Sequence, residues 1–313
     1  LLLFGTVVIV YTTIGGFKAV VTTDTIQGVI MVIGGFIILF TIVSSAGGFD
    51  SLIDKLNAEN PAWADVTSGG TTTKAYVMSF WVTVGIGVLG LPQTAVRGMG
   101  FKDTKALHNA MIYGTIVVGF LMLVMHISGV FAPAVLDESE FSNTDYVVPA
   151  LVLKYMNPVV AGLFIAAPLA AVMSTVSSLL ILASAAIVKD LYLNYIAKPE
   201  QRKEPKFNNR IKNLSVGTTF LIGAIVFVFT IYPPDLIVWI NLFAMGGLEC
   251  AFFCPILFGL YWKRANSTAC ILSAVLGVVS FILMTTFEMT FFGAAPIVPS
   301  ILISIAAFIF GGY

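Results

Sequence analysis

The chain has 313 residues and no formal net charge, and 58% of its residues are hydrophobic while only 10% are charged. An ordinary soluble domain carries about 25% charged residues. This composition excludes a typical soluble domain, and the zero net charge argues against a nucleic-acid partner. The first ten residues lack the basic segment and cleavage site of a signal peptide.

Apolar runs near the length needed to cross a bilayer, about 20 residues, follow one another along the chain. They predict an all-α polytopic membrane protein whose surroundings are the lipid bilayer. The expected spans are 24–44, 75–96, 107–132, 158–188, 214–232, 236–261, 267–287 and 296–312. Residues 1–10 resemble the end of another span, so we expect the chain to be part of a longer protein.

The basic residues predict an orientation. If the spans alternate strictly, 13 of the 16 Lys and Arg residues fall on one side, and the positive-inside rule assigns that side to the cytoplasm. The loop 189–213 is then cytoplasmic, and the loops 45–73 and 133–157 are outside. We therefore expect a multi-pass protein of the inner (plasma) membrane. Within the last of these loops, 146–155 is expected to form a short lid-like helix.

The span 75–96 contains residues that interrupt a helix: Gly85, Gly87, Gly90 and Pro92. Glycine loosens the backbone, and proline frees a carbonyl group. At membrane depth, irregular backbone survives where it is buried in protein or lines a watery cavity, and broken helices form the sites of many transporters. The alternative is a packing kink, since Gly and Pro are common in membrane helices.

The span 158–188 carries small and hydroxyl residues on one helix face, at Ala171, Ser174, Thr175 and Ser178. Hydroxyl oxygens suit a hard cation such as sodium. Two alternatives remain open: Ser and Thr in membrane helices often bond their own preceding carbonyl, and small residues often serve close helix packing.

Two carboxylates stand out in or beside the spans. Asp24 lies where a predicted cytoplasmic loop enters the next span, so it is either an N-cap or part of an ion path. Glu249 lies near the middle of the span 236–261, where an ionisable group marks a functional site or a buried polar link. The three cysteines lie in apolar segments without metal-ligand spacing, so we expect them to pack and expect no metal beyond sodium.

Four stretches of the sequence resemble the solute:sodium symporter family, and they span nearly the whole chain in the expected order. They are the run 11–19 (YTTIGGFKA) followed by Thr23, Asp24 and Gln27, then GLPQTAVRGMG at 90–100, AAVMSTVSSLLILASAAIVKDLY at 170–192, and LFGLYWKRAN at 257–266. The resemblance implies import of a small organic solute together with a co-transported sodium ion. The first expectation for the solute is pantothenate, with another small carboxylate or proline as alternatives.

The same resemblance implies a LeuT-like fold of two inverted repeats that lacks its N-terminal helices. Residues 1–44 would be the end of the first repeat, 75–261 the second repeat, and 267–313 peripheral helices. Its sodium-site helix matches the backbone oxygen of Ala171 and the hydroxyls of Ser174 and Thr175, and its ion-path aspartate matches Asp24. Its solute-facing positions match Val84, Val88 and Pro92. The proline symporter has aromatic residues at the first two of these, so the valines argue against proline.

Two other function classes compete with this interpretation. The chain could be the transporter-like sensor domain of a signalling kinase, which would continue into soluble domains. A membrane-embedded enzyme is disfavoured, because the sequence has neither paired carboxylates nor a Ser–His arrangement. No protein partner can be named from the sequence.

Overall fold

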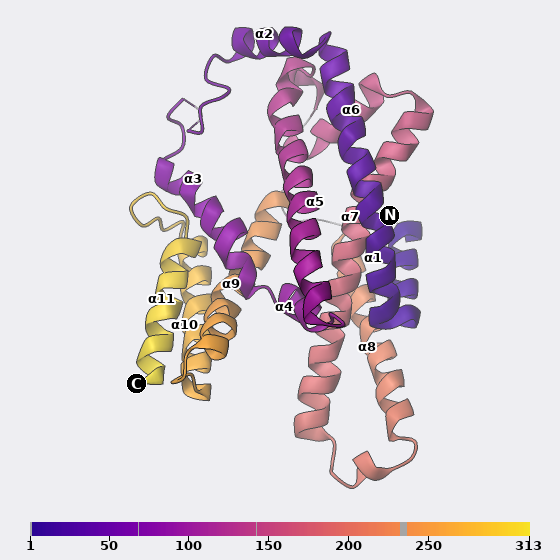
Figure 1. The fold of residues 1–313 in the computed structure, drawn as a ribbon, viewed down its shortest axis with the longest axis vertical. Helices are drawn as coiled ribbons and strands as arrows, with labels where there is room; N and C mark the ends of the chain where they lie inside the picture. Colours follow the sequence, from indigo (N-terminus) through magenta and orange to yellow (C-terminus); the bar gives the residue numbers. More distant parts are fainter. Residues whose placement is uncertain (1, 68, 142, 232–236) are drawn as a thin grey trace. The chain divides into compact units, whose positions relative to one another are not determined.

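The computed structural model describes residues 2–67, 69–141, 143–231 and 237–313, and within these ranges every regular element is a helix (Figure 1). Short turns of 3₁₀ and π helix connect or extend the α-helices. The α-helices are α1 (Leu2–Ala46), α2 (Phe49–Glu59), α3 (Lys74–Trp81), α4 (Pro92–Met99), α5 (Thr104–Phe131), α6 (Val147–Tyr155), α7 (Pro158–Ala185), α8 (Phe207–Phe229), α9 (Ile237–Tyr261), α10 (Ser267–Thr286) and α11 (Ile297–Gly312).

Six of the described helices are long and apolar enough to cross a membrane, and a seventh crossing results if the bent pair of α3 and α4 is one span. They correspond to the predicted spans in order. The helix at the expected span 296–312, α11, has 16 residues, which is short of the length of about 20 that a bilayer needs. The expected end of the span at 232 and the expected start of the next at 236 lie outside the described residues.

The N-terminal region differs from the prediction. A loop was expected between residues 1–10 and the span beginning at 24, but α1 is helical from Leu2 to Ala46 and is interrupted only at Gly16. The backbone of Gly16 has φ 60° and ψ −163°, a conformation that glycine adopts without a side-chain clash. Because helix resumes directly after this residue, Asp24 lies inside a helix. The N-cap alternative for Asp24 is therefore wrong.

The chain divides into two compact units, Leu1–Ile53 with Tyr113–Pro234, and Asp54–Ile112 with Asp235–Tyr313. In the first unit, α1 packs closely on α7. A methyl group added at Gly34 of α1 would lie 2.2 Å from the Cβ atom of Ala167 in α7. Small residues at such crossings let helices in a membrane approach closely, and this contact aligns the second part of α1 with the hydroxyl-bearing helix.

The second unit is built around α9, which packs against α10 and α11. Its core contains the fully buried Cys250 and Cys254 together with the aromatic residues Phe253, Phe281 and Phe308. The prediction that these two cysteines pack in the interior is confirmed. Behind them, a methyl group at Gly277 of α10 would lie 2.3 Å from the Cys250 carbonyl oxygen, so α9 and α10 are in backbone contact.

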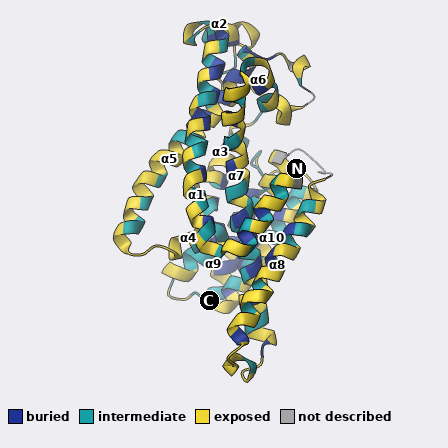
Figure 2. Cartoon of the chain, turned by 90° about the vertical axis from the view of Figure 1, so that its right-hand side faces the viewer, coloured by how far each residue is buried: buried dark blue, intermediate teal, exposed yellow. Residues whose placement is uncertain are grey.

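The long helices have narrow buried stripes and wide apolar surfaces (Figure 2). Between 11% and 33% of the residues in the most apolar windows of the six long helices are buried. Large exposed side chains such as Phe40, Ile116 and Phe220 lie on the outward faces. An aqueous surface this apolar would be an aggregation hazard, so the exposed faces suit contact with lipid or with further helices.

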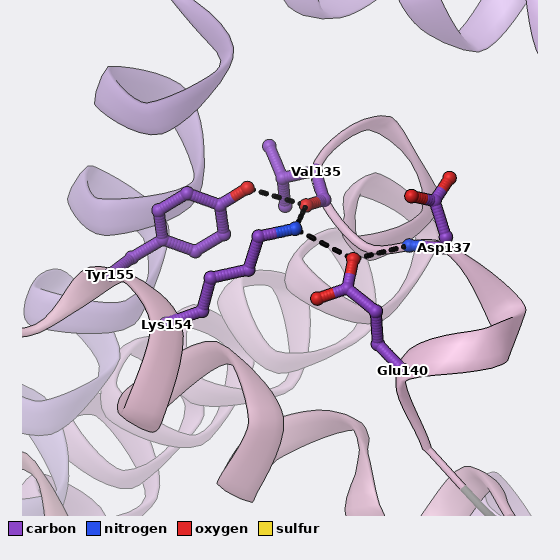
Figure 3. Close-up of polar contacts among 5 residues, drawn as sticks. All are labelled: Val135, Asp137, Glu140, Lys154 and Tyr155. Carbon is purple, nitrogen blue, oxygen red and sulfur yellow. Dashed lines mark hydrogen bonds and ion pairs between the residues drawn. The ribbon is translucent and has the colours of Figure 1, made fainter.

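The short helix α6 confirms the expected helix at 146–155, and polar contacts at its end anchor it (Figure 3). The Lys154 ammonium donates to Glu140 Oε1 at 2.6 Å and to the Val135 carbonyl oxygen at 3.2 Å. Tyr155 donates its hydroxyl to the same carbonyl oxygen at 2.6 Å. The backbone N–H of Asp137 also donates to Glu140 Oε1. These contacts join the end of α6 to the loop that precedes it.

Candidate functional site

The span that contains α3 and α4 is broken, as its glycines and proline predicted. After α3 the backbone forms a π-helical stretch, Val82–Ile86, and then a 3₁₀ turn, Gly87–Gly90. Leu91 is extended, and α4 begins at Pro92, so the two halves meet with a bend of 48°. Proline is well suited to the first turn of a helix, where its missing N–H would have no partner. The break therefore has a local cause in the sequence.

The three predicted solute-facing residues lie along this break. Val84 is in the π-helical stretch with 52% of its surface exposed, Val88 is half-buried in the 3₁₀ turn, and Pro92 is half-buried at the start of α4. They occupy successive turns of the irregular segment, and Val84 presents a free apolar surface.

Glu249 of α9 lies directly against the break and is only 2% exposed. A methyl group added at Gly87 would lie 2.4 Å from Glu249 Oε2, and one added at Gly90 would lie 2.8 Å from the Glu249 carbonyl oxygen. The expected burial is confirmed. The expected polar partner is not found for Oε2, which has no hydrogen-bond partner among the described residues.

The predicted sodium-site residues lie on one face of α7, in the other unit. Ala171 and Ser174 are half-buried and Thr175 is exposed. The Thr175 hydroxyl donates to the Ala171 carbonyl oxygen at 3.1 Å, and the Ser178 hydroxyl donates to the Ser174 carbonyl oxygen at 2.9 Å. These bonds within one helix are the pattern that the packing alternative described. The Ala171 carbonyl oxygen and the Thr175 hydroxyl oxygen therefore lie next to each other on α7.

Helix α1, which packs on α7, carries further side-chain oxygen atoms. Their residues were not among the site candidates predicted from the sequence. Tyr11 donates its hydroxyl to the Met173 carbonyl oxygen of α7 at 3.3 Å. Next to it, the hydroxyl oxygens of Thr12 and Thr13 are buried without a hydrogen-bond partner among the described residues, as is Gln27 Oε1. All four residues belong to the stretch that carried the family resemblance, which was the available signal.

A cavity of about 690 Å³ lies between α1, α5, α6 and α7 in the first unit. Ala171 and Pro168 of α7 line it, together with Gly34 of α1 and Val148 and Val152 of α6. Its volume is within the range of small-molecule sites, about 300–1,000 Å³. The short helix α6 thus forms part of the wall of a cavity that reaches a predicted sodium ligand.

Among the described residues, no group of three or more His, Cys, Asp or Glu side chains is arranged to hold a metal ion.

A family model described as the sodium:solute symporter family matches residues 1–277. The chain belongs to the sodium:solute symporter family.

Named relatives in the family resemble this chain along almost all of its length. The sodium/pantothenate symporter of Haemophilus influenzae is 43% identical over 99% of this chain, and that of Escherichia coli is 41% identical over the same share. The sodium/proline symporter of Staphylococcus aureus is 31% identical over 97%. The chain spans 63% of the length of each pantothenate symporter and 60% of the proline symporter.

A solved structure shares the fold. The chain superimposes on a Na⁺-coupled sialic acid symporter, in a substrate-bound outward-open state, with a TM-score of 0.72 and 19% identity. The match covers 99% of this chain and 64% of that one. The predicted all-α, LeuT-like fold is thereby confirmed. As a family member with several apolar helices, the chain is a multi-pass membrane protein, and its named relatives are transporters rather than enzymes.

Proposed function

We propose that the protein imports a small organic solute with sodium by alternating access, and that this solute is pantothenate. The observation that carries the proposal is the 41–43% identity to two sodium/pantothenate symporters over 99% of the chain. The sodium/proline symporter of Staphylococcus aureus is 31% identical. Val84 and Val88 stand where the resemblance to the proline symporter implies aromatic residues. A carrier of this kind performs no covalent chemistry.

Specific roles follow from the family resemblance and from the geometry. Sodium would bind the Ala171 carbonyl oxygen and the hydroxyls of Ser174 and Thr175, since sodium is a hard ion that favours oxygen. The separation of 3.1 Å between the Thr175 hydroxyl oxygen and the Ala171 carbonyl oxygen supports this assignment. Asp24, half-buried in α1, would lie on the path by which the ion leaves.

The solute would contact Val84, Val88 and Pro92 along the break. Support comes from the irregular backbone itself, because irregular backbone in a membrane is tolerated where it is buried in protein or lines a watery cavity, and broken helices form the binding sites of many transporters. We assign the end of the first inverted repeat to residues 1–44, the second repeat to 75–261, and peripheral helices to 267–313.

The test is uptake of labelled pantothenate by the full-length protein in proteoliposomes, with an inward sodium gradient or with potassium replacing sodium. We expect sodium-dependent uptake that unlabelled pantothenate inhibits and proline does not. Sodium-dependent proline uptake without pantothenate uptake would replace the proposed solute. Uptake that does not respond to sodium would contradict the coupling.

We also propose that the protein lies in the inner (plasma) membrane with residues 189–213 in the cytoplasm, because 13 of 16 basic residues fall on that side. Single cysteines at 200–206 should react with an impermeant thiol reagent only after the cells are opened, whereas cysteines at 133–157 should react in intact cells. Reaction at 200–206 in intact cells would reverse the orientation.

A further inference from the structure

The residue type at position 249 is not explained by packing. The Glu249 side chain is 2% exposed inside an apolar helix, and its Oε2 atom has no hydrogen-bond partner among the described residues. A buried polar atom without a hydrogen-bond partner lowers the stability of the folded protein. An apolar side chain would avoid that cost, so the contact made by this carboxyl group calls for an explanation beyond stability.

The carboxyl group contacts the residue that closes the π-helical stretch. Gly87 donates its backbone N–H to the Val82 carbonyl oxygen, which is the last bond of that stretch. The position of a Gly87 methyl group would lie 2.4 Å from Glu249 Oε2, 2.9 Å from its Cδ atom and 3.1 Å from the Val82 carbonyl oxygen. The side chain of Glu249 therefore touches the backbone where the helix changes its winding.

One turn later α9 makes backbone contact with the same segment. A methyl group at Gly90 would lie 2.8 Å from both the Glu249 carbonyl oxygen and the Phe253 nitrogen. Helix α9 therefore contacts the break at two places. At Gly90 the neighbours on α9 are backbone atoms, which cannot move independently. At Gly87 the nearest neighbour on α9 is the end of the Glu249 side chain. Substitutions can distinguish these two contacts.

The N-terminal half of the broken span, α3, is held by other hydrogen bonds within the same unit. Thr73, the N-cap of α3, donates its hydroxyl to the Gly293 carbonyl oxygen at 2.8 Å, and Ala295 donates its backbone N–H to the Ser79 hydroxyl at 2.9 Å. The loop between α10 and α11 thus fixes α3, while Glu249 contacts the segment after it. The irregular backbone lies between two anchored points.

We propose that Glu249 is a positioning residue for the solute site, acting through Gly87 on the backbone that carries Val84 and Val88. This inference rests on the proposed function. Gly87 lies between these two valines in the sequence, so a shift of its backbone moves both apolar side chains. The backbone contact at Gly90 limits how closely α9 approaches the break, and the carboxyl group at Gly87 fixes the position of the backbone between the two valines.

The decisive test is a pair of substitutions in the full-length protein. Gly87→Ala adds a methyl group against Glu249 Oε2, and Glu249→Asp shortens the side chain by one methylene group. We expect Gly87→Ala to raise the half-saturating pantothenate concentration about tenfold or more, since misplacement by about 1 Å can cost up to about a hundredfold. The half-saturating sodium concentration should change much less. Gly87→Ala combined with Glu249→Asp should recover most of the solute affinity.

Two glycines provide matched controls. Gly85→Ala adds a methyl group that meets nothing within 4 Å, so its expression and folding should match the parent protein. Gly90→Ala should be as damaging as Gly87→Ala, but Glu249→Asp should not rescue it, because its neighbours are backbone atoms. Rescue of both variants, or of neither, would overturn the proposal.

A second measurement does not depend on transport. A cysteine at position 88 reports the geometry of the break through its rate of reaction with a thiol reagent, against the background of the buried or half-buried native cysteines. Gly87→Ala should change this rate severalfold, and Glu249→Asp should restore it. Absence of pantothenate uptake by the parent protein would reject the proposed function, while an unchanged labelling rate would reject this inference. If the Gly87→Ala protein does not accumulate, recovery of folded protein in the double variant supports the contact between Glu249 and Gly87. Failure of the double variant to accumulate contradicts this contact.

Discussion

Two membrane segments of this protein contain polar side chains, and the hydrogen bonding of those side chains differs between the two segments. On α7 the hydroxyls of Thr175 and Ser178 bond to carbonyl oxygens one turn earlier in the same helix, which stays regular from Pro158 to Ala185. At the break between α3 and α4 the helix is irregular, and the nearby carboxyl group of Glu249 comes from another helix and has an oxygen without a partner.

The difference lies in the cost of changing state. A hydroxyl that donates to a carbonyl oxygen of its own helix can turn towards an ion at the loss of one weak hydrogen bond. The carbonyl oxygen still accepts the backbone N–H of the helix. A carboxyl group wedged against a neighbouring backbone cannot turn without moving that backbone. The α7 face therefore suits an ion that binds and leaves, whereas the Glu249 contact suits a fixed spacing.

The largest effect on the sodium dependence is expected on the α7 face. Ser174→Ala or Thr175→Ala removes an oxygen ligand and should raise the sodium concentration for half-maximal uptake about tenfold, which corresponds to about 1.4 kcal/mol. Solute affinity should fall mainly at low sodium, because coupling between the two ligands is reciprocal. The measurement is uptake against sodium concentration in the full-length protein.

Ser178→Ala is the control for this face, since its hydroxyl lies one turn further along and bonds the Ser174 carbonyl oxygen. It should leave the sodium dependence unchanged. Equal sodium dependence in all three variants and the parent would mean that the hydroxyl face only packs.

The next effect concerns Glu249. Glu249→Gln keeps the length and shape of the side chain and should preserve folding and much of the uptake. Glu249→Leu places a branched side chain against Gly87, and such changes of shape in a packed interior cost about 1–3 kcal/mol. Thermal unfolding in detergent measures the stability, and uptake measures the function. A Leu variant with both parental uptake and a parental unfolding temperature would show that Glu249 neither supports the site nor stabilises the contact with Gly87.

A comparable stability effect is expected at the crossing of α1 and α7, without a carboxyl group. Gly34→Ala adds a methyl group 2.2 Å from the Ala167 Cβ atom, and overpacking of this kind costs about 1–3 kcal/mol. Gly28→Ala is the matched control in the same helix, because its methyl group meets nothing within 4 Å. The transition temperatures of the two variants in detergent should differ, and equal values would contradict the observed close approach.

The smallest effect is expected at the exposed end of α6. The Lys154 ammonium, followed by the Asp137 N–H, lowers the pKa of Glu140 below its ordinary value of 4.5. The Glu140 carboxylate raises the pKa of Lys154 above 10.5. A lowered acid pKa gives stability that is present above 4.5 and is lost as the pH falls further; a raised lysine pKa gives stability that is present below 10.5 and is lost as the pH rises further.

Glu140→Gln should therefore increase proteolysis of the loop before α6 between these two pH values, and the difference from the parent should vanish in acid. The effect should be small because the side chains of Lys154 and Glu140 are 39% and 28% exposed and solvent screens their attraction. Glu59→Gln, at the end of α2, is the control. A difference that persists in strong acid would exclude the ion pair as its cause.

The class of the protein, the order of its membrane helices and the position of the break could all be predicted from the amino-acid sequence. Long apolar runs set the helices, because a bilayer demands a fixed length and internal backbone bonding. Pro92 and the glycines before it set the break, because proline cannot continue a helix. These are local properties, readable within about 20 residues.

Tertiary structure decided the rest. A cytoplasmic loop was predicted before Asp24, but the folded backbone shows a single break at Gly16 with helix on both sides, which places Asp24 inside a helix. Likewise, nothing in the sequence pairs Gly87 with Glu249, because that contact arises only when α9 packs across the break. A glycine in a sequence can indicate that another group packs closely against the backbone. The identity of that group depends on residues far away in the chain.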